Sequence, residues 1–124
     1  MPEILIIDDE EAAVFGFSRY FSKQGYSVQS AGTIEEGRRH IQSSSFDAVV
    51  LDIRLPDGNA LEFIPEIKAF NQKTTVVVVS GLADNDTAQT AQEMGADDFL
   101  VKPLKMAALC EALKNAFESS SLAI

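Results

Sequence analysis

The chain has 124 residues, which is enough for one ordinary domain with a single core and too few for two. Hydrophobic residues make up 46% and charged residues 23%, which indicates a globular protein and excludes a disordered or collagen-like chain. The net charge of −9 opposes binding to the phosphates of nucleic acids and is compatible with a cation site, so we expect no direct nucleic-acid contact by this segment.

Nothing in the sequence indicates a membrane segment or an export signal. The longest apolar run, residues 76–79, is far shorter than a membrane span. The start of the chain lacks a basic region followed by a long apolar one. We therefore expect a cytoplasmic protein without membrane contact. The single cysteine, Cys110, cannot form an internal disulfide and is predicted to be a packed thiol.

Five short strands are predicted along the chain. Residues 4–7, 48–51 and 76–79 are continuous apolar runs, which are typical of parallel strands covered on both faces. Residues 26–30 alternate between apolar and polar side chains, which predicts an edge strand with one face toward water. The fifth strand is predicted at residues 99–101.

Helices are expected after each of these strands, beginning with two in the first half of the chain. Residues 14–21 have apolar side chains at helical spacing, and Gly25 follows where a left-handed helix end favours glycine. Residues 34–41 form a second, weaker helix with Thr33 as its N-cap.

Two further helices follow the third and fourth strands. The third is predicted at residues 61–70, with Asn59 as its cap and a local bend at Pro65, because proline removes a backbone donor and crowds the preceding turn. The fourth is predicted from about Asp84 to residue 94, and it ends at Gly95. Its inward side chains are small, so we expect it to be shallowly buried and mobile.

The last helix is predicted at residues 109–117, and the serines at 119–121 indicate the start of a linker. The predicted division is therefore one domain at residues 1–118, with 119–124 as a linker or disordered tail. Regular alternation of strands and helices predicts an α/β fold with a parallel sheet and right-handed crossovers.

Polar residues follow four of the predicted strands, at the ends where parallel strands meet along one edge. Asp8 and Asp9 follow the first strand, Asp52 the third, Ser80 the fourth and Lys102 the fifth. Taken singly, each has an ordinary explanation as a cap, a turn residue or a solvated charge. Three carboxylates on neighbouring strand ends repel one another, however, unless a cation or a proton relieves them. Ligands of open α/β sheets bind at this edge, so we predict the functional site there.

The expected cation is Mg²⁺, or Mn²⁺ in its place, with Asp9 and Asp52 as ligands. Magnesium prefers oxygen ligands and commonly combines one or two carboxylates with phosphate oxygens. With the negative charge neutralised, a carboxylate such as Asp52 can attack phosphorus and carry the phosphoryl group as a mixed anhydride. Lys102 would offer a mobile positive charge to a phosphate oxygen, and Ser80 a short hydroxyl donor.

These motifs resemble the signature of response regulator receiver domains, and the resemblance spans nearly the whole chain. The matching residues are Asp8-Asp9, Asp52 with Pro56 shortly after it, Ser80-Gly81 and Lys102-Pro103. The resemblance implies a flavodoxin-like (βα)5 three-layer sandwich whose five-stranded parallel sheet has the order 2-1-3-4-5. The alternating strand expected at an edge agrees with that order. An X-Pro bond such as Lys102-Pro103 can be cis or trans, and the sequence leaves the isomer open.

The resemblance also implies the chemistry. A sensor histidine kinase, or a phosphotransfer protein, would donate a phosphoryl group from a phosphohistidine to Asp52. The magnesium ion would be held by Asp8, Asp9, Asp52 and the backbone carbonyl of Arg54. The chain would catalyse its own phosphorylation and dephosphorylation without turning over an external substrate.

Ser80 and Phe99 are the switch residues that the resemblance implies. In similar proteins the residue matching Ser80 moves toward the phosphoryl group, while an aromatic residue matching Phe99 changes its exposure. The surface of the fourth helix, fifth strand and last helix would then control an output domain or partner, and a homodimer could form through it. Phe99 lacks the hydroxyl of the tyrosine common at that position, and a plain core role is the alternative. Ala60 stands where the family usually has glycine.

The output is suggested by a narrower resemblance. Residues 53–68 and 95–103 are similar to receivers of the nitrogen-regulation class, the enhancer-binding activators. The larger proteins of that class activate transcription through an ATPase and a DNA-binding domain.

Three rival functions fit parts of the sequence. A magnesium-dependent phosphohydrolase of the haloacid-dehalogenase type needs two aspartates separated by one residue, and Asp8-Asp9-Glu10 lacks that spacing. A flavodoxin-like cofactor site needs a Ser/Thr/Gly-rich phosphate loop after the first strand, where this chain has two acids. A receiver-like interaction module that is never phosphorylated would have no need of all five site positions, and this chain retains them.

Overall fold

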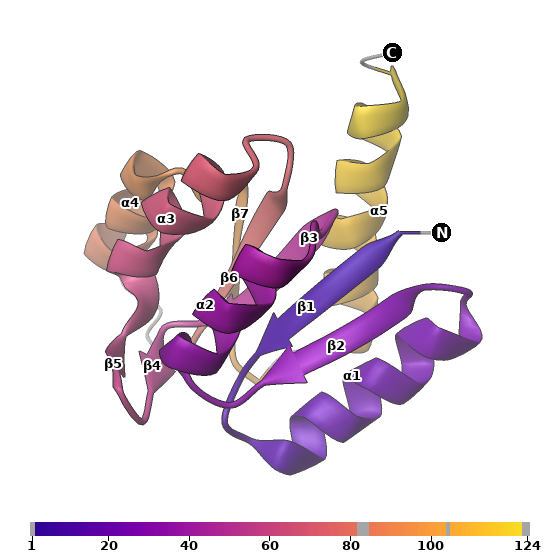
Figure 1. The fold of residues 1–124 in the computed structure, drawn as a ribbon, viewed down its shortest axis with the longest axis horizontal. Helices are drawn as coiled ribbons and strands as arrows, with labels where there is room; N and C mark the ends of the chain where they lie inside the picture. The colour runs from indigo at the N-terminus through magenta and orange to yellow at the C-terminus, as the bar shows by residue number, and fades with distance from the viewer. Residues whose placement is uncertain (1, 82–84, 104, 123–124) are drawn as a thin grey trace.

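A computed structural model gives the fold and describes residues 2–81, 85–103 and 105–122 (Figure 1). Five parallel strands form one sheet in the order β2-β1-β3-β6-β7, and β4 and β5 form a separate antiparallel hairpin. The strands are β1 (Glu3–Ile7), β2 (Ser27–Ala31), β3 (Ala48–Asp52), β4 (Arg54–Leu55), β5 (Gly58–Asn59), β6 (Thr75–Ser80) and β7 (Asp98–Val101). The helices are α1 (Glu11–Lys23), α2 (Ile34–Ser43), α3 (Phe63–Phe70), α4 (Asn85–Met94) and α5 (Met106–Leu122), with the 3-10 helix η1 (Ala60–Glu62) before α3.

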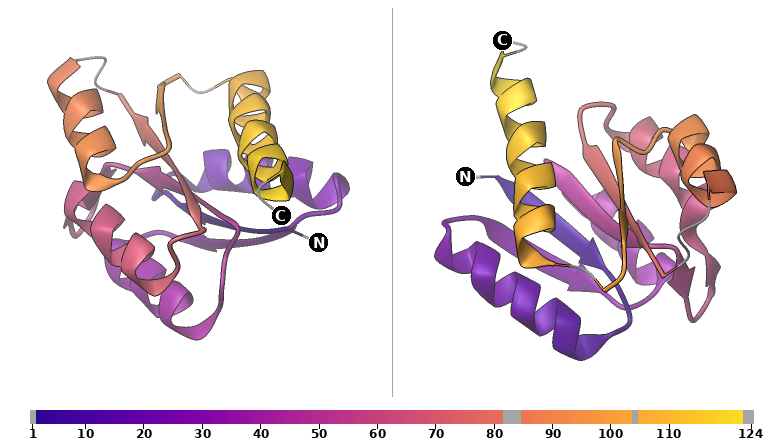
Figure 2. Two further views of the ribbon diagram at one scale, coloured as in Figure 1. Left: turned by 90° about the horizontal axis from the view of Figure 1, so that it is seen from above. Right: turned by 180° about the vertical axis from the view of Figure 1, so that it is seen from behind.

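The helices cover both faces of the sheet and make three layers. Helices α1 and α5 lie on one face, and α2, α3 and α4 lie on the other (Figure 2). Successive residues of β1 point to opposite faces, so Leu5 and Ile7 belong to the core beneath α2 and α3, whereas Ile4 and Ile6 belong to the core beneath α1 and α5. The predicted flavodoxin-like fold and its strand order are confirmed, including the edge position of β2.

Three of the predicted helix ends are also confirmed. The side chain of Thr33 accepts a hydrogen bond from the backbone N–H of Glu36, 3.0 Å away, and so caps α2. Gly25 and Gly95 follow α1 and α4 with φ values of 93° and 113°, which glycine adopts without a steric cost. The predicted start of the fourth helix at Asp84 lies outside the described residues.

The third helical segment differs from the prediction of one helix interrupted at Pro65. It begins with η1, in which the Asn59 side chain accepts a hydrogen bond from the N–H of Leu61 at 2.9 Å, and α3 starts only at Phe63. Pro65 therefore lies in the first turn of α3. A missing N–H interrupts no helical hydrogen bond there, because the first N–H groups of a helix have no partner within it.

Helix α5 continues through Leu122, so the serines predicted to begin a linker are helical. Serine is only mildly unfavourable inside a helix, so composition alone placed the end too early. The division between a domain at 1–118 and a tail at 119–124 stays a prediction. In the part of the chain that the structure describes, no helix is both long and apolar enough to cross a membrane.

Candidate functional site

The carboxyl ends of four parallel strands bring the predicted site residues to one edge of the sheet. Asp52 ends β3 beside Val79 of β6, and Ser80 ends β6 beside Val101 of β7. The two aspartates Asp8 and Asp9 directly follow β1, whose last residue lies beside Leu51 of β3. Neighbouring strands in register therefore place these side chains together.

Asp8, Asp9 and Asp52 form an acidic cluster. One carboxylate oxygen of each lies within 4.8 Å of the others. The side chains of Asp8 and Asp52 are only 10% and 7% exposed, whereas Asp9 is exposed at the mouth of the site. Carboxylates that are this close together and partly withdrawn from water favour a bound cation.

Lys102 lies between the carboxylates. Its Nζ donates a hydrogen bond to Asp52 Oδ2 at 2.9 Å, and it lies 3.9 Å from Asp8 Oδ2 and 4.0 Å from Glu10 Oε2. Partial burial alone would lower the pKa of Lys102, but the hydrogen bond with Asp52 and the negative charges of Asp8 and Glu10 raise it above its ordinary value. The lysine is therefore a permanent positive charge in the site.

The site disfavours the charged form of Asp8. Burial raises its pKa above the ordinary value, although the backbone N–H of Glu10 donates to Asp8 Oδ1 at 2.9 Å and Lys102 is near. The charged form of Asp8 is thus incompletely compensated by the protein, as expected of a group that shares a cation with its neighbours.

Of the remaining predicted residues, Ser80 and Arg54 lie beside this cluster, whereas Phe99 lies next to Val78, farther back along the sheet. Ser80 is buried, and its carbonyl accepts a hydrogen bond from the N–H of Lys102 at 2.8 Å. The N–H of Arg54 donates to Asp52 Oδ1 at 3.3 Å, so the peptide that follows the acidic strand end contacts the central carboxylate directly. Phe99 is half-buried against the core beneath α3 and α4, and the Lys102-Pro103 peptide bond is cis.

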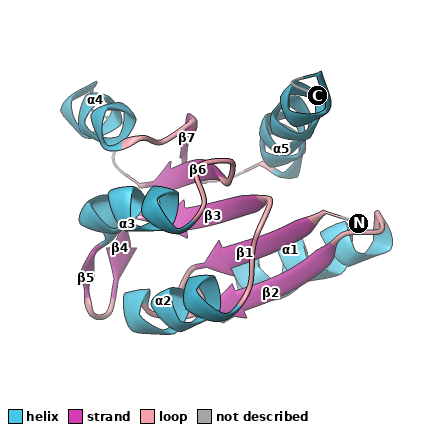
Figure 3. Ribbon diagram, turned by 45° about the horizontal axis from the view of Figure 1, so that its top comes forward, coloured by secondary structure: helices cyan, strands magenta, loops and turns pink. Residues whose placement is uncertain are grey.

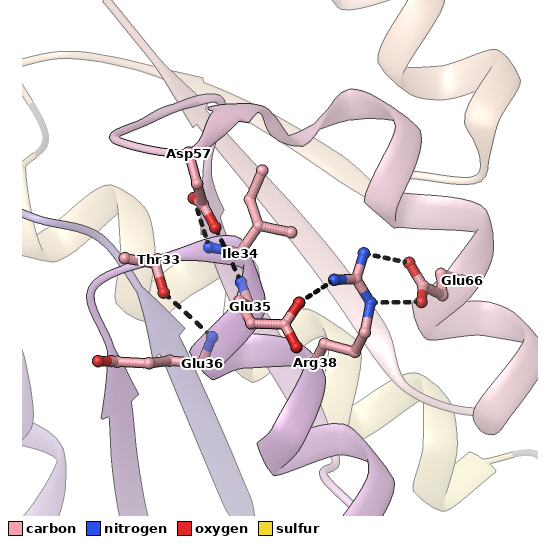
Figure 4. A network of polar contacts seen from close by, with 7 residues as sticks. All are labelled: Thr33, Ile34, Glu35, Glu36, Arg38, Asp57 and Glu66. Atoms are coloured by element: carbon pink, nitrogen blue, oxygen red, sulfur yellow. Dashed lines mark hydrogen bonds and ion pairs between the residues drawn. The ribbon is translucent and has the colours of Figure 1, made fainter.

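Two features of the site were missed by the sequence analysis. Glu10 faces Lys102, and the hairpin of β4 and β5 follows Asp52 directly and carries Asp57 at its tip. Both oxygens of Asp57 accept backbone hydrogen bonds at the start of α2, and the N–H of Ile34 lowers the pKa of Asp57 most (Figure 4). The run Pro56-Asp57-Gly58 is a turn signal that would have predicted the hairpin.

Comparison with known proteins gives a match over most of the chain. Residues 4–114 match the family model of the response regulator receiver domain. The transcriptional regulatory protein TorR of Escherichia coli K12 is 34% identical over 114 residues, which are 90% of this chain and 48% of TorR. The chain spans about half, or less, of the length of the curated relatives that it matches.

Solved structures agree with the family match. A CheY-like receiver domain protein from Methanospirillum hungatei superposes with a TM-score of 0.94 at 26% identity, over 100% of this chain and 99% of the other. A response regulator from Burkholderia pseudomallei, whose structure contains a phosphorylated aspartic acid, a calcium ion and citrate, superposes with a TM-score of 0.87 at 27% identity. That match covers 99% of this chain and 73% of the other.

Proposed function

We propose, from the premise that this chain belongs to the response regulator receiver domain family, that it accepts a phosphoryl group on Asp52. The donor is the phosphohistidine of a sensor histidine kinase or of a phosphotransfer protein. Receivers of this family are signalling domains of two-component systems and are not enzymes that turn over an external substrate. The phosphoryl group on Asp52 therefore acts as a signal.

The observation that carries the proposal is the position of Asp52 between positive and negative neighbours. Its carboxylate is nearly buried, bonded to Lys102, and within reach of Asp8 and Asp9. One of its oxygens forms the bond to phosphorus while the bond from phosphorus to the donor nitrogen breaks, and the imidazole leaves with a proton from solvent. Lys102 can then exchange its contact with Asp52 for a phosphoryl oxygen, and Ser80 adjoins the same edge with its hydroxyl.

The acidic cluster fits a magnesium ion. Its ligands are oxygens only, and two oxygens on opposite sides of an octahedral Mg²⁺ lie about 4.2 Å apart. The three carboxylate oxygens within 4.8 Å are close to that spacing already. We propose that Asp8, Asp9, Asp52 and the Arg54 carbonyl hold the ion, or Mn²⁺ in its place, with Asp8 acting directly or through water. The ion would offset the negative charge that keeps a phosphoryl donor away from the carboxylates.

We propose that phosphorylation of Asp52 moves Ser80 and Phe99 and thereby changes the surface of α4, β7 and α5. Phe99 is half-buried on β7, and Val101 on the same strand is 42% exposed, so this edge offers apolar surface to a partner. TorR is a transcriptional regulatory protein, and we propose a cytoplasmic transcriptional output for this chain also. An output domain, a separate partner protein or a second copy of the chain would bind there.

The test is phosphorylation by acetyl phosphate in the presence of Mg²⁺. Intact-mass spectrometry should show one added phosphoryl group on the protein and none on Asp52→Asn. The addition should disappear when EDTA removes the metal. No mass shift in the wild-type protein, or an unchanged shift in Asp52→Asn, would refute the assignment. Steady turnover of a small phosphomonoester would favour a phosphohydrolase instead.

A further inference from the structure

The hairpin of β4 and β5 begins two residues after Asp52 and contacts it through the N–H of Arg54. Arg54 pairs with Asn59 and Leu55 with Gly58, so Pro56 and Asp57 form a two-residue tip. The hairpin projects from the sheet edge toward α2, and it lies beside the start of that helix (Figure 3). Leu55 is the one buried residue of the two short strands, and a hairpin of this length needs further contacts to hold its tip in place.

The base of the hairpin is fixed to the sheet. The N–H of Ile53 donates to the carbonyl of Val79 at 3.2 Å, and the N–H of Ala60 donates to the carbonyl of Ile53 at 2.8 Å. Between these bonds and the tip lies Arg54, whose N–H donates to Asp52 Oδ1. The Ile53–Arg54 peptide is thus held at the base, whereas the Arg54 carbonyl belongs to the next peptide toward the tip, so its position depends on how the tip is held as well.

The tip itself is held by the side chain of Asp57, and Leu55, just before the tip, is buried in the core beneath α2 and α3. Asp57 Oδ1 accepts from the N–H of Ile34 at 2.9 Å, and Oδ2 accepts from the N–H of Glu35 at 3.1 Å (Figure 4). The first N–H groups of a helix have no partners within it, and a carboxylate at this end also gains from the helix dipole. Thr33 takes the N–H of Glu36, so the capping of α2 is divided between its own N-cap and the hairpin.

The anchor point on α2 is itself rigid. The guanidinium of Arg38 binds Glu35 and makes two hydrogen bonds with Glu66 of α3, at 2.7 and 3.1 Å. Gly37 allows α2 to approach the sheet so closely that an added Cβ would lie 2.6 Å from Ile7 Cδ1. A hairpin tied to this helix is therefore tied to the core.

We propose that Asp57 is a positioning residue for the phosphoacceptor site: by fixing the hairpin tip to α2, it holds the Arg54 carbonyl in place beside Asp52 and so strengthens Mg²⁺ binding. The inference rests on the proposed function, in which the Arg54 carbonyl and Asp52 are both ligands. Asp57 acts through Arg54 and does not touch the metal. Groups that orient the ligands of a metal commonly change its affinity as much as a ligand contact does.

A matched pair of variants separates positioning from simple helix capping. Asp57→Ala and Thr33→Ala each remove a capping acceptor from the same end of α2, but only Asp57→Ala releases the hairpin. Isothermal titration calorimetry should give a dissociation constant for Mg²⁺ that rises on the order of tenfold in Asp57→Ala. Thr33→Ala should leave that constant within about twofold of wild type, because any loss of helix stability it causes does not pass through the hairpin.

A second variant, Asp57→Asn, gives three further readouts. Asp57→Asn keeps one carbonyl oxygen as an acceptor, so its Mg²⁺ affinity should lie between wild type and Asp57→Ala. Hydrogen exchange measured without metal should show faster exchange of the Arg54 N–H in both Asp57 variants and an unchanged rate in Thr33→Ala. At saturating Mg²⁺, phosphorylation of Asp57→Asn by acetyl phosphate should return to the wild-type rate.

Failure of the inference and failure of the proposed function give different results. If wild type binds Mg²⁺ and is phosphorylated, but Asp57→Asn matches wild type in metal affinity and in Arg54 exchange, the positioning role is wrong and the receiver function stands. Equal weakening by Thr33→Ala and Asp57→Ala would also overturn it, because the effect would then come from α2 stability. If wild type neither binds Mg²⁺ nor gains a phosphoryl group, the positioning role and the receiver function are both wrong.

Discussion

The ammonium group of Lys102 lies 2.9 Å from Asp52 Oδ2, so a positive side chain occupies the side of the carboxylate that faces the acidic cluster. Lys102 and a divalent cation compensate the same negative charges. Each therefore weakens the other's hold on Asp52, even though both stabilise a phosphoryl group there.

Replacing Lys102 by alanine should tighten Mg²⁺ binding in the absence of phosphate. The dissociation constant should fall about threefold to tenfold, which corresponds to ~0.7–1.4 kcal/mol of additional binding free energy. Lys105→Ala removes an equal charge from an exposed position on the same segment and should change the affinity by less than about twofold at moderate salt. Calorimetric titration of both variants makes the comparison. Weaker Mg²⁺ binding by Lys102→Ala than by Lys105→Ala would contradict the competition.

Asp8→Asn should stabilise the metal-free protein at neutral pH. Burial raises the pKa of Asp8 in the folded state, so the unfolded chain loses this proton first and ionisation disfavours folding. The penalty is absent below the ordinary pKa of the carboxyl group, grows as the pH rises from that value to the raised pKa of the folded state, and is fully present at pH 7. Thermal unfolding in EDTA should therefore give a higher Tm for Asp8→Asn at pH 7 and a smaller difference near pH 4.

The control for that experiment is Asp9→Asn, since Asp9 is exposed and its side chain carries no comparable burial. It should raise the Tm less than Asp8→Asn does. Adding Mg²⁺ should reverse the order of the variants, because a ligand that binds only the folded state stabilises wild type most. An Asp8→Asn protein that is less stable than wild type in EDTA at pH 7 would show that the charged carboxylate is already well compensated.

Replacement by alanine should change the stability of the protein in opposite directions at two glycines inside helices. Gly16 of α1 has open space around an added Cβ, so Gly16→Ala should stabilise the protein by about 0.5–1 kcal/mol through helix propensity. At Gly37 of α2 the new Cβ would lie 2.6 Å from Ile7 Cδ1, 3.3 Å from Ile7 Cγ1 and 3.5 Å from Phe63 Cε2. Overpacking there should outweigh the propensity gain and cost about 1–2 kcal/mol net.

Urea denaturation measures both glycine variants under the same conditions. Ile7 is fully buried and immediately precedes Asp8, so Gly37→Ala should also weaken Mg²⁺ binding, whereas Gly16→Ala should not. A stabilised Gly37→Ala protein would mean that α2 can move away from the sheet without cost, which would also weaken the case for α2 as a rigid anchor.

The sequence was sufficient for the sheet and for the convergence of the site, because both follow from patterns that are local in the chain. Continuous apolar runs predict buried parallel strands, and the residues after such strands must share one edge. The sequence was insufficient where tertiary contacts decide the local structure. The bond between Asp57 and α2 joins residues 22 and 23 positions apart, and no periodicity marks it. The length of α5 was also missed, since three serines lower helix propensity without ending a helix.

Beryllofluoride, which mimics a phosphoryl group on a carboxylate, should change the backbone of α4, β7 and α5 more than the rest of the protein. Helix α4 is poorly anchored: among its residues whose burial is described, Ala91 alone is buried. An element with so few buried contacts opens at low free-energy cost, so a small change at Ser80 and Phe99 can shift it. Hydrogen exchange with Mg²⁺ and beryllofluoride should therefore alter these amides in the wild type.

Two comparisons make the beryllofluoride experiment decisive. Asp52→Asn should show no change, since it lacks the carboxylate that beryllofluoride binds. Helix α2 should show less change than α4, because Asp57 and the Arg38–Glu66 pair hold it to the hairpin and to α3. Identical exchange across α4, β7 and α5 with and without beryllofluoride would place the readout elsewhere. In that case α2 and the hairpin, the other elements tied to Asp52, would be the surface to test next.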